Sequence, residues 1–221
     1  MDGYRLERVR FSRPLPLKEG FLHIQKHLEN LGRPIAAFGA CELRSPEPFT
    51  EQGFADFNNI YIGTLKEWGI YEEGGDNPIA RSNVIPELNK PLSPSIHAFT
   101  YTMPDAKAKP SFVIAGSAET PEGKSDYRTH SICLGDISQE GLMKKGSWVL
   151  DEMERRMAGL GFTWADSTAT QVYTVHNFHH VMANEIVKRG AALSGIDWHY
   201  NRPPVQDLEF EMDCRGVYAE I

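Results

Sequence analysis

The stretch Pro78-Ile79-Ala80-Arg81-Ser82-Asn83-Val84 carries one arginine from a loop into an extended, apolar run. Pro78 disfavours a helical conformation of the residue before it, so the chain approaches Arg81 extended. A strand start can hold a guanidinium rigidly over a cleft, where its planar fork matches the two oxygens of a carboxylate. A surface ion pair is the simpler interpretation of Arg81 taken alone, so the rest of the sequence has to decide between the two.

Composition excludes several classes of protein. The 221 residues fit one large domain or two small fused units, and 41% of them are hydrophobic. The net charge of −7 disfavours a nucleic-acid partner, whose phosphates select basic surfaces. No apolar run approaches the roughly 20 residues of a membrane helix, and no signal core follows the N-terminus. Three cysteines without CxxC spacing indicate reduced thiols and a cytoplasmic protein: Cys41, Cys133 and Cys214.

Apolar spacing predicts the elements. Helices are expected over 17–31, from a Thr50 N-cap onward, over 142–160 and from Phe178. Strands are expected over 1–16 (an edge strand), 35–43, 83–87, 95–101, 111–119, 168–175 and 208–212. Each half of the chain then runs helix, strand, helix, loop, strand. This order indicates a diverged internal repeat with units 1–104 and 105–221.

Four motifs carry a family resemblance. Residues 78–82 are a one-residue-expanded form of Pro-Ala-Arg-Ser, and Phe54-Ala55-Asp56-Phe57-Asn58-Asn59-Ile60-Tyr61 matches Phe-Ala-x-x-Asn-x-x-Tyr. In the second half, 112–117 and 208–211 stand where the family has Ile-Thr-Ser-Gly-Gln and Ile-Glu-Ile-Glu strands. With these motifs the sequence resembles the reactive-intermediate deaminase (Rid, or YjgF-like) family. Two such halves in one chain are also similar to chorismatases and aminomuconate deaminases.

The resemblance implies a fold, an assembly and a site. The fold would be α+β, with two tandem Rid-like (chorismate-mutase-like) units, each a mixed sheet backed by helices. The assembly would be a homotrimer without cofactor, acting on a small carboxylate-bearing substrate. Arg81 would bind that carboxylate and Asn58 would line the same cleft. Gly116 and Ser117 would supply the opposite wall.

The two halves depart from the family in complementary ways. Asn58 and Arg81 lie in the first half, which has no Gly-Ser strand. The second half has that strand, but Met182 stands in place of the asparagine, and Arg202 lies on a shortened loop. We therefore expect a composite site from both halves, with Arg202 as a further candidate for binding the carboxylate.

The sequence does not decide which residues transfer protons. His97 stands where the family has its water-orienting glutamate, but a histidine within an apolar strand is as often a core residue. Glu119, Glu209 and Glu87 are substitute carboxylates. Glu209 and Glu211 alternate along one strand, so they are either a buried pair with one raised pKa or the solvated face of an edge strand. Ser117 has no nucleophile-elbow context and is expected to have a hydrogen-bonding role.

Three histidines suggest a metal site but do not complete one. His176 and His180 are four residues apart and could share a helix face with His179 nearby. No third ligand lies close in sequence, so exposed histidines and no metal are expected.

Together these features favour a cofactor-independent deaminase. It would hydrolyse an enamine or imine of a small unsaturated amino-carboxylate such as 2-aminomuconate and release ammonia, a reaction of aromatic-compound degradation. Two alternatives remain: a chorismatase-like hydrolase of an enol ether, and a non-catalytic protein that binds small carboxylates.

Overall fold

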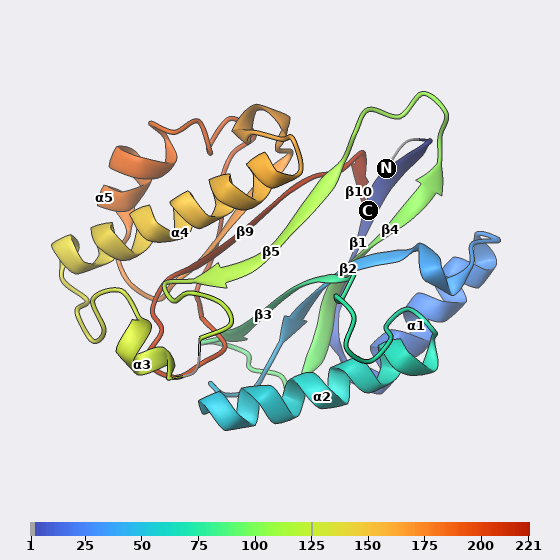
Figure 1. Ribbon diagram of the computed structural model, residues 1–221, viewed down its shortest axis with the longest axis horizontal. Coiled ribbons are helices and arrows are strands. Elements are labelled where there is room, and N and C mark those ends of the chain that lie inside the picture. The colour runs from blue at the N-terminus through green and yellow to red at the C-terminus, as the bar shows by residue number, and fades with distance from the viewer. Residues whose placement is uncertain (1–2, 125) are drawn as a thin grey trace.

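Two β-sheets form the framework of the chain (Figure 1). The computed structural model describes residues 3–124 and 126–221. The first sheet has six strands, in the order β10 (Ala219–Glu220), β1 (Tyr4–Pro16), β4 (Ser95–Pro104), β2 (Phe38–Arg44), β3 (Ala80–Pro86) and β8 (Asn201–Arg202). The second has four, in the order β5 (Phe112–Ala118), β9 (Glu211–Gly216), β6 (Ala169–Tyr173) and β7 (Asp197–His199). The predicted α+β class is confirmed.

Three long helices cover these sheets, namely α1 (Leu17–Asn30), α2 (Glu51–Glu67) and α4 (Gln139–Gly159). Figure 1 shows α4 against β5 and β9, and α1 and α2 on the other sheet. The Thr50 and Ser138 side chains cap α2 and α4 by accepting the backbone N–H of Gly53 and Gly141. The shorter helices are α3 (Tyr127–His130), α5 (His179–Val181), two 3₁₀ turns (Ile35–Ala37, Trp164–Asp166) and a π-helix (Met182–Ile186). No helix in the described part of the chain is long and apolar enough to cross a bilayer.

Each long helix buries the apolar face that its spacing predicts. In α1 and α2 the buried residues include Ile24, Leu28, Tyr61 and Leu65, which pack on the first sheet. In α4 the buried face packs on the second sheet through Val149, Leu150, Met153 and Met157. Each such side chain contributes about 1.5–3 kcal/mol when it leaves water, so these faces fix which side of each sheet stays open.

Two strand predictions need correction. Strand β1 is not an edge, because β10 pairs with it in parallel and matches Glu7 with Ala219. The strand predicted over 208–212 begins only at Glu211. Before that point the Glu119 carboxylate, rather than a neighbouring strand, accepts the backbone N–H groups of Glu209 and Phe210. Glu209 and Glu211 therefore do not share a strand face.

The helix predicted from Phe178 is shorter than its apolar spacing suggests. It forms the single turn of α5, continues as the π-helix and ends in turns around Gly190, whose φ of +85° favours glycine. The widened π-turn shifts the register, so the 3.6-residue spacing stops before Leu193, which is exposed.

The two sheets meet where β5 lies beside β3 (Figure 1). Strand β8 extends the first sheet by pairing Arg202 with Ile85, and β10 extends its other end. Segments from beyond residue 105 therefore complete the sheet that the earlier part of the chain begins. The division into units 1–104 and 105–221 stays a prediction.

Candidate active site

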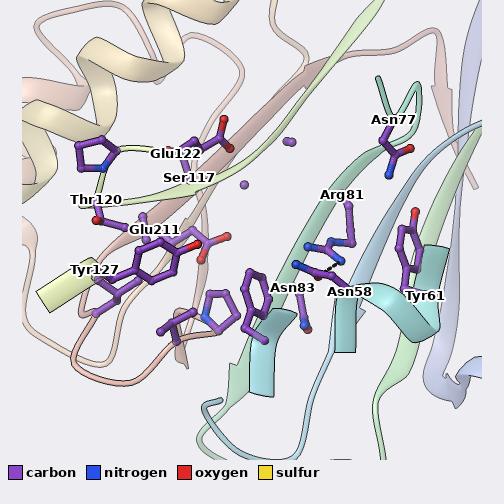
Figure 2. A pocket seen from close by; sticks show the side chains of 18 of the residues that line it. Asn58, Tyr61, Asn77, Arg81, Asn83, Ser117, Thr120, Glu122, Tyr127 and Glu211 are labelled. Atoms are coloured by element: carbon purple, nitrogen blue, oxygen red, sulfur yellow. Dashed lines mark hydrogen bonds between the residues drawn. The ribbon is translucent and has the colours of Figure 1, made fainter. Parts of the chain in front are cut away.

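A pocket of about 320 Å³ opens at the junction of the two sheets (Figure 2). Helix α2 and strand β3 supply one wall, which carries Asn58, Tyr61 and Arg81. Strands β5 and β9, the loop after β5 and the start of α3 supply the other wall, which carries Ser117, Thr120, Glu122, Tyr127 and Glu211. The pocket thus joins side chains that lie far apart in the sequence.

Arg81 is held in place by neutral groups. Its Nη1 donates to Asn58 Oδ1 at 2.6 Å, and its guanidinium lies 5.1 Å from the ring centroid of Tyr61 and 5.3 Å from that of Phe54. Cation–π contacts of this kind orient a guanidinium without neutralising it. Among the described residues, no ion pair involves Arg81. Its positive charge is therefore available to an anion in the pocket.

Strand β5 carries a bulge at the pocket. Its register against β9 shifts between Ile114 and Ser117, so one extra residue lies on β5 at this point. The glycine in that bulge makes room for a neighbour, because a β-carbon on Gly116 would lie 2.2 Å from Glu211 Oε1. The bulge and the missing side chain together let Glu211 reach the pocket.

Glu211 is a buried acid. Its side chain lines the pocket although the residue is only 3% exposed, and its Oε2 has no hydrogen-bond partner among the described residues. Burial, with the carboxylates of Asp213 and Glu119, raises the pKa of Glu211 well above its ordinary value, while Arg81 opposes the rise. The raised pKa favours the neutral carboxylic acid form of Glu211, which can donate a proton.

Asp213 lies two residues further along β9 and connects the strands below the pocket. It accepts hydrogen bonds from the Ser82 hydroxyl and, at 2.8 Å, from the Tyr173 hydroxyl. Burial, followed by repulsion from Glu42, raises the pKa of Asp213 to about 6. The contact between Asp213 and Ser82 ties β9 to β3 directly beside Arg81.

A family model described as 2-aminomuconate deaminase CnbZ matches residues 1–221. The chain belongs to the CnbZ family. It is 48% identical over 220 residues to 2-amino-5-chloromuconate deaminase of Comamonas testosteroni, covering 99% of this chain and 87% of that protein. The predicted similarity to aminomuconate deaminases is confirmed.

Solved structures with a similar fold include a chorismatase. It superposes on this CnbZ family member with a TM-score of 0.59 and 15% identity, over 98% of this chain and 76% of the chorismatase. The similarity to chorismatases that the sequence indicated is confirmed at the level of the fold. The E. coli YjgF protein matches with a TM-score of 0.35 and 14% identity, over 48% of this chain and 80% of YjgF.

The structure brings half of the predicted site residues together in this CnbZ family member. Asn58 and Arg81 line the pocket from α2 and β3, and Gly116 and Ser117 line it from β5. The pocket is therefore composite, as the complementary losses in the two halves of the sequence indicated. The roles of these residues in binding stay predictions.

His97 and Glu119 do not reach this pocket. His97 faces a different pocket, where its ring centroid lies 6.4 Å from that of His199. Burial and the nearby Arg44 lower the pKa of His97 to about 3, so it is neutral near pH 7. Glu119 has no exposed surface and forms an ion pair with Lys145 at 2.9 Å, which holds the backbone before β9. Neither residue lines the pocket that holds Arg81, and their roles in proton transfer stay predictions.

Glu209 and Arg202 also lie elsewhere, in an ionic network outside the pocket. Arg202 lies 2.9 Å from Glu87 and 3.5 Å from Glu209, and Glu209 Oε2 lies 2.7 Å from His176 Nε2. These contacts occupy the charges that were expected to contact substrate. The described residues contain no cluster of three or more His, Cys, Asp and Glu side chains that would hold a metal ion.

The pocket residue that the sequence analysis undervalued is Glu211, which it named only as the neighbour of Glu209 in a possible buried pair. The sequence does contain a signal for it, because charged residues alternate with apolar ones at positions 211, 213 and 215. Such alternation places three charges on one face of a strand. With the strand predicted to start at Leu208, both carboxylates were placed on one face, and Glu209 was chosen from the pair as the candidate proton carrier.

Proposed function

We propose that this chain hydrolyses the enamine of a small unsaturated amino-dicarboxylate of the 2-aminomuconate class and releases ammonia. The observation that carries the proposal is Glu211, a buried acid with a raised pKa that shares one pocket with an unneutralised arginine. Membership in the CnbZ family and 48% identity to a 2-amino-5-chloromuconate deaminase support the same substrate class. Deamination of an enamine requires these two functions, an anion clamp and an acid.

Arg81 orients the substrate. Its fork binds one substrate carboxylate, a charged hydrogen-bonded contact that contributes about 2–3 kcal/mol. Asn58 keeps the guanidinium aimed into the pocket through the 2.6 Å hydrogen bond. Tyr61 and Phe54 line the same wall and suit the flat diene of the substrate.

Glu211 carries the proton transfers: it gives one proton to the substrate and takes another from water. It donates its proton to a carbon of the dienamine, so that a C–H bond forms and the nitrogen lone pair closes a C=N bond. Water then adds to the iminium carbon and returns a proton to the Glu211 carboxylate. The resulting carbinolamine transfers its hydroxyl proton to nitrogen, the C–N bond breaks, and ammonia and a 2-oxo acid leave. No cofactor is needed for these steps.

The first experiment is an ammonia-release assay with 2-aminomuconate. We expect Glu211→Gln to lower kcat by about 10²–10⁴-fold, the range of a lost general acid. Glu209→Gln is the matched control, because it removes a carboxylate two residues away that lies outside the pocket. Equal activity of the Glu211 and Glu209 variants would overturn the role of Glu211.

The same assay separates the alternatives. Pyruvate from chorismate, with no ammonia from 2-aminomuconate, would identify an enol-ether hydrolase, whose substrate also needs a proton on carbon. Tight binding of 2-aminomuconate without any product would identify a binding protein. A homotrimer, a cytoplasmic location and a part in aromatic-compound degradation complete the proposal, and sedimentation of the pure protein tests the trimer.

A further inference from the structure

The pocket wall opposite Arg81 has a second guanidinium behind it. Arg156 reaches from α4 to strand β5, where Nη1 donates to the Ala115 carbonyl at 3.2 Å and Nη2 to Ser117 Oγ at 3.1 Å. The Arg156 side chain is only 13% exposed. Because Ser117 lines the pocket, this buried positive charge lies one hydrogen bond away from any ligand there.

The anionic partner of Arg156 on this side is Glu122. Its Oε1 lies 3.0 Å from Arg156 Nη2, and Glu122 also lines the pocket. The Glu122 side chain is 67% exposed, on the loop that follows β5. An ion pair with one partner in water contributes little, so Glu122 can leave at low cost. The buried guanidinium keeps its other carboxylate partner, Glu152, which lies 3.0 Å from Nε, and its Nη2 is then open to a carboxylate in the pocket.

Two hydroxyl groups lie on the same wall. Ser117 Oγ accepts from Arg156, which leaves its own hydrogen free to be donated. Thr120 is 8% exposed and lines the pocket, and its Oγ1 has no hydrogen-bond partner among the described residues. Figure 2 shows Ser117, Thr120 and Glu122 on the side of the pocket across from Arg81. A buried hydroxyl without a partner indicates a ligand group that completes it.

We propose that Arg156, Ser117 and Thr120 form a second carboxylate subsite, from which a dicarboxylate displaces Glu122. The inference rests on the proposed function and deepens it: Arg81 binds one substrate carboxylate and this subsite binds the other. Exchange of the Glu122 carboxylate for that of the substrate keeps the local charge balanced, so no buried charge is left unpaired. The pocket therefore selects dicarboxylates over monocarboxylates.

The test compares two non-reacting ligands that share one diene. Hexa-2,4-dienedioate (muconate) has two carboxylates and hexa-2,4-dienoate (sorbate) has one, and calorimetry measures the Kd of each. We expect the wild type to bind muconate at least tenfold more tightly than sorbate. Arg156→Gln should abolish that preference and leave sorbate binding unchanged, and Glu122→Gln should tighten muconate binding several-fold.

Two further variants keep the test independent of folding. Thr120→Val preserves the shape of the side chain and should weaken muconate alone. Arg155→Gln is the matched control, since Arg155 pairs with Glu152 as Arg156 does but is 68% exposed, and should change neither Kd. Equal losses for muconate and sorbate in Arg156→Gln and Thr120→Val would overturn the subsite.

Failure of this inference is distinguishable from failure of the proposed function. Ammonia release by the wild type tests the function without reference to Arg156. Release of ammonia, together with a muconate preference that survives Arg156→Gln, would overturn only the subsite. A preference that depends on Arg156, with no ammonia from any enamine, would overturn only the deaminase.

Discussion

The Glu211 carboxylate occupies the space that a side chain on Gly116 would need. A β-carbon at Gly116 would meet Glu211 Oε1 at 2.2 Å and the Ser82 α-carbon at 3.3 Å. The requirement for glycine therefore comes from a side chain on the neighbouring strand β9 and from the backbone of β3. The buried acid of the pocket and the glycine beside it form one structural unit.

The first prediction follows from this unit. Gly116→Ala should displace Glu211, remove most of the ammonia-releasing activity and destabilise the fold by about 1–3 kcal/mol, the usual cost of overpacking. The control is Gly63→Ala in α2, where an added β-carbon meets nothing within 4 Å. That change should stabilise the helix by about 0.5–1 kcal/mol. Thermal unfolding and kcat are measured on both, and wild-type kcat in Gly116→Ala would contradict the prediction.

The second prediction concerns stability and pH. The pKa of Glu211 is raised in the folded state above its unfolded value of about 4.3, so between the two values the folded protein binds more protons. The contribution of Glu211 to stability is thus most favourable below pH 4 and is lost as pH rises through the raised pKa. Glu211→Gln should therefore be more stable than wild type at pH 8, with a smaller difference at pH 5. A difference in melting temperature that is the same at both pH values would contradict this.

The third prediction concerns the pH dependence of turnover. Glu211 acts only in its protonated form, so kcat should fall as pH rises through its raised pKa. Fixed-time assays of ammonia release between pH 5 and 9 measure this fall. The residual rate of Glu211→Gln should not change with pH. A wild-type kcat that rises steadily with pH would indicate a general base instead.

The fourth prediction separates charge from shape at Arg81. Arg81→Lys keeps the positive charge but loses the planar fork and the hydrogen bond to Asn58. We expect kcat/KM to fall about 10- to 100-fold, as for the loss of one charged hydrogen bond. Arg13→Lys, at an exposed position on β1, is the control and should leave kcat/KM unchanged. Equal kcat/KM in both variants would remove Arg81 from the site.

The fifth prediction tests the structural role of Glu119. Lys145→Met leaves the Glu119 carboxylate buried without its cation, which should cost about 3–5 kcal/mol of stability. Denaturant unfolding measures that loss. Glu119→Gln should retain near wild-type kcat at pH 5 and at a temperature where it is folded, because Glu119 does not line the pocket and acts on Glu211 only by raising its pKa. A selective loss of kcat in a fully folded Glu119→Gln would restore it as a proton carrier.

The helices of the first half were predictable from local signals. The Thr50 cap and the apolar spacing of α2 are local signals, and they placed Asn58 correctly on the helix that faces Arg81. The arginine at the start of β3 was predictable for the same reason, since a proline and an apolar run mark that junction.

Other parts of the site depend on contacts that no local pattern records. The start of β9 is set by Glu119, a carboxylate some ninety positions earlier in the chain, which captures the N–H groups before Glu211. A sequence pattern places a strand only within a few residues. Here the strand starts three residues later than predicted, and the buried acid is Glu211 rather than Glu209. The bulge of β5 is likewise invisible without its partner strand.

The parallel pairing of β1 with β10 also bears on how the chain folds. It joins Glu7 to Ala219, nearly the whole chain apart, and Arg8 beside it is buried against Glu220. Loop-closure entropy delays contacts of such long range, and a high contact order slows folding. We therefore expect slow refolding in which β10 joins the first sheet late. Ligand affinity should recover no sooner than the pairing of β1 with β10.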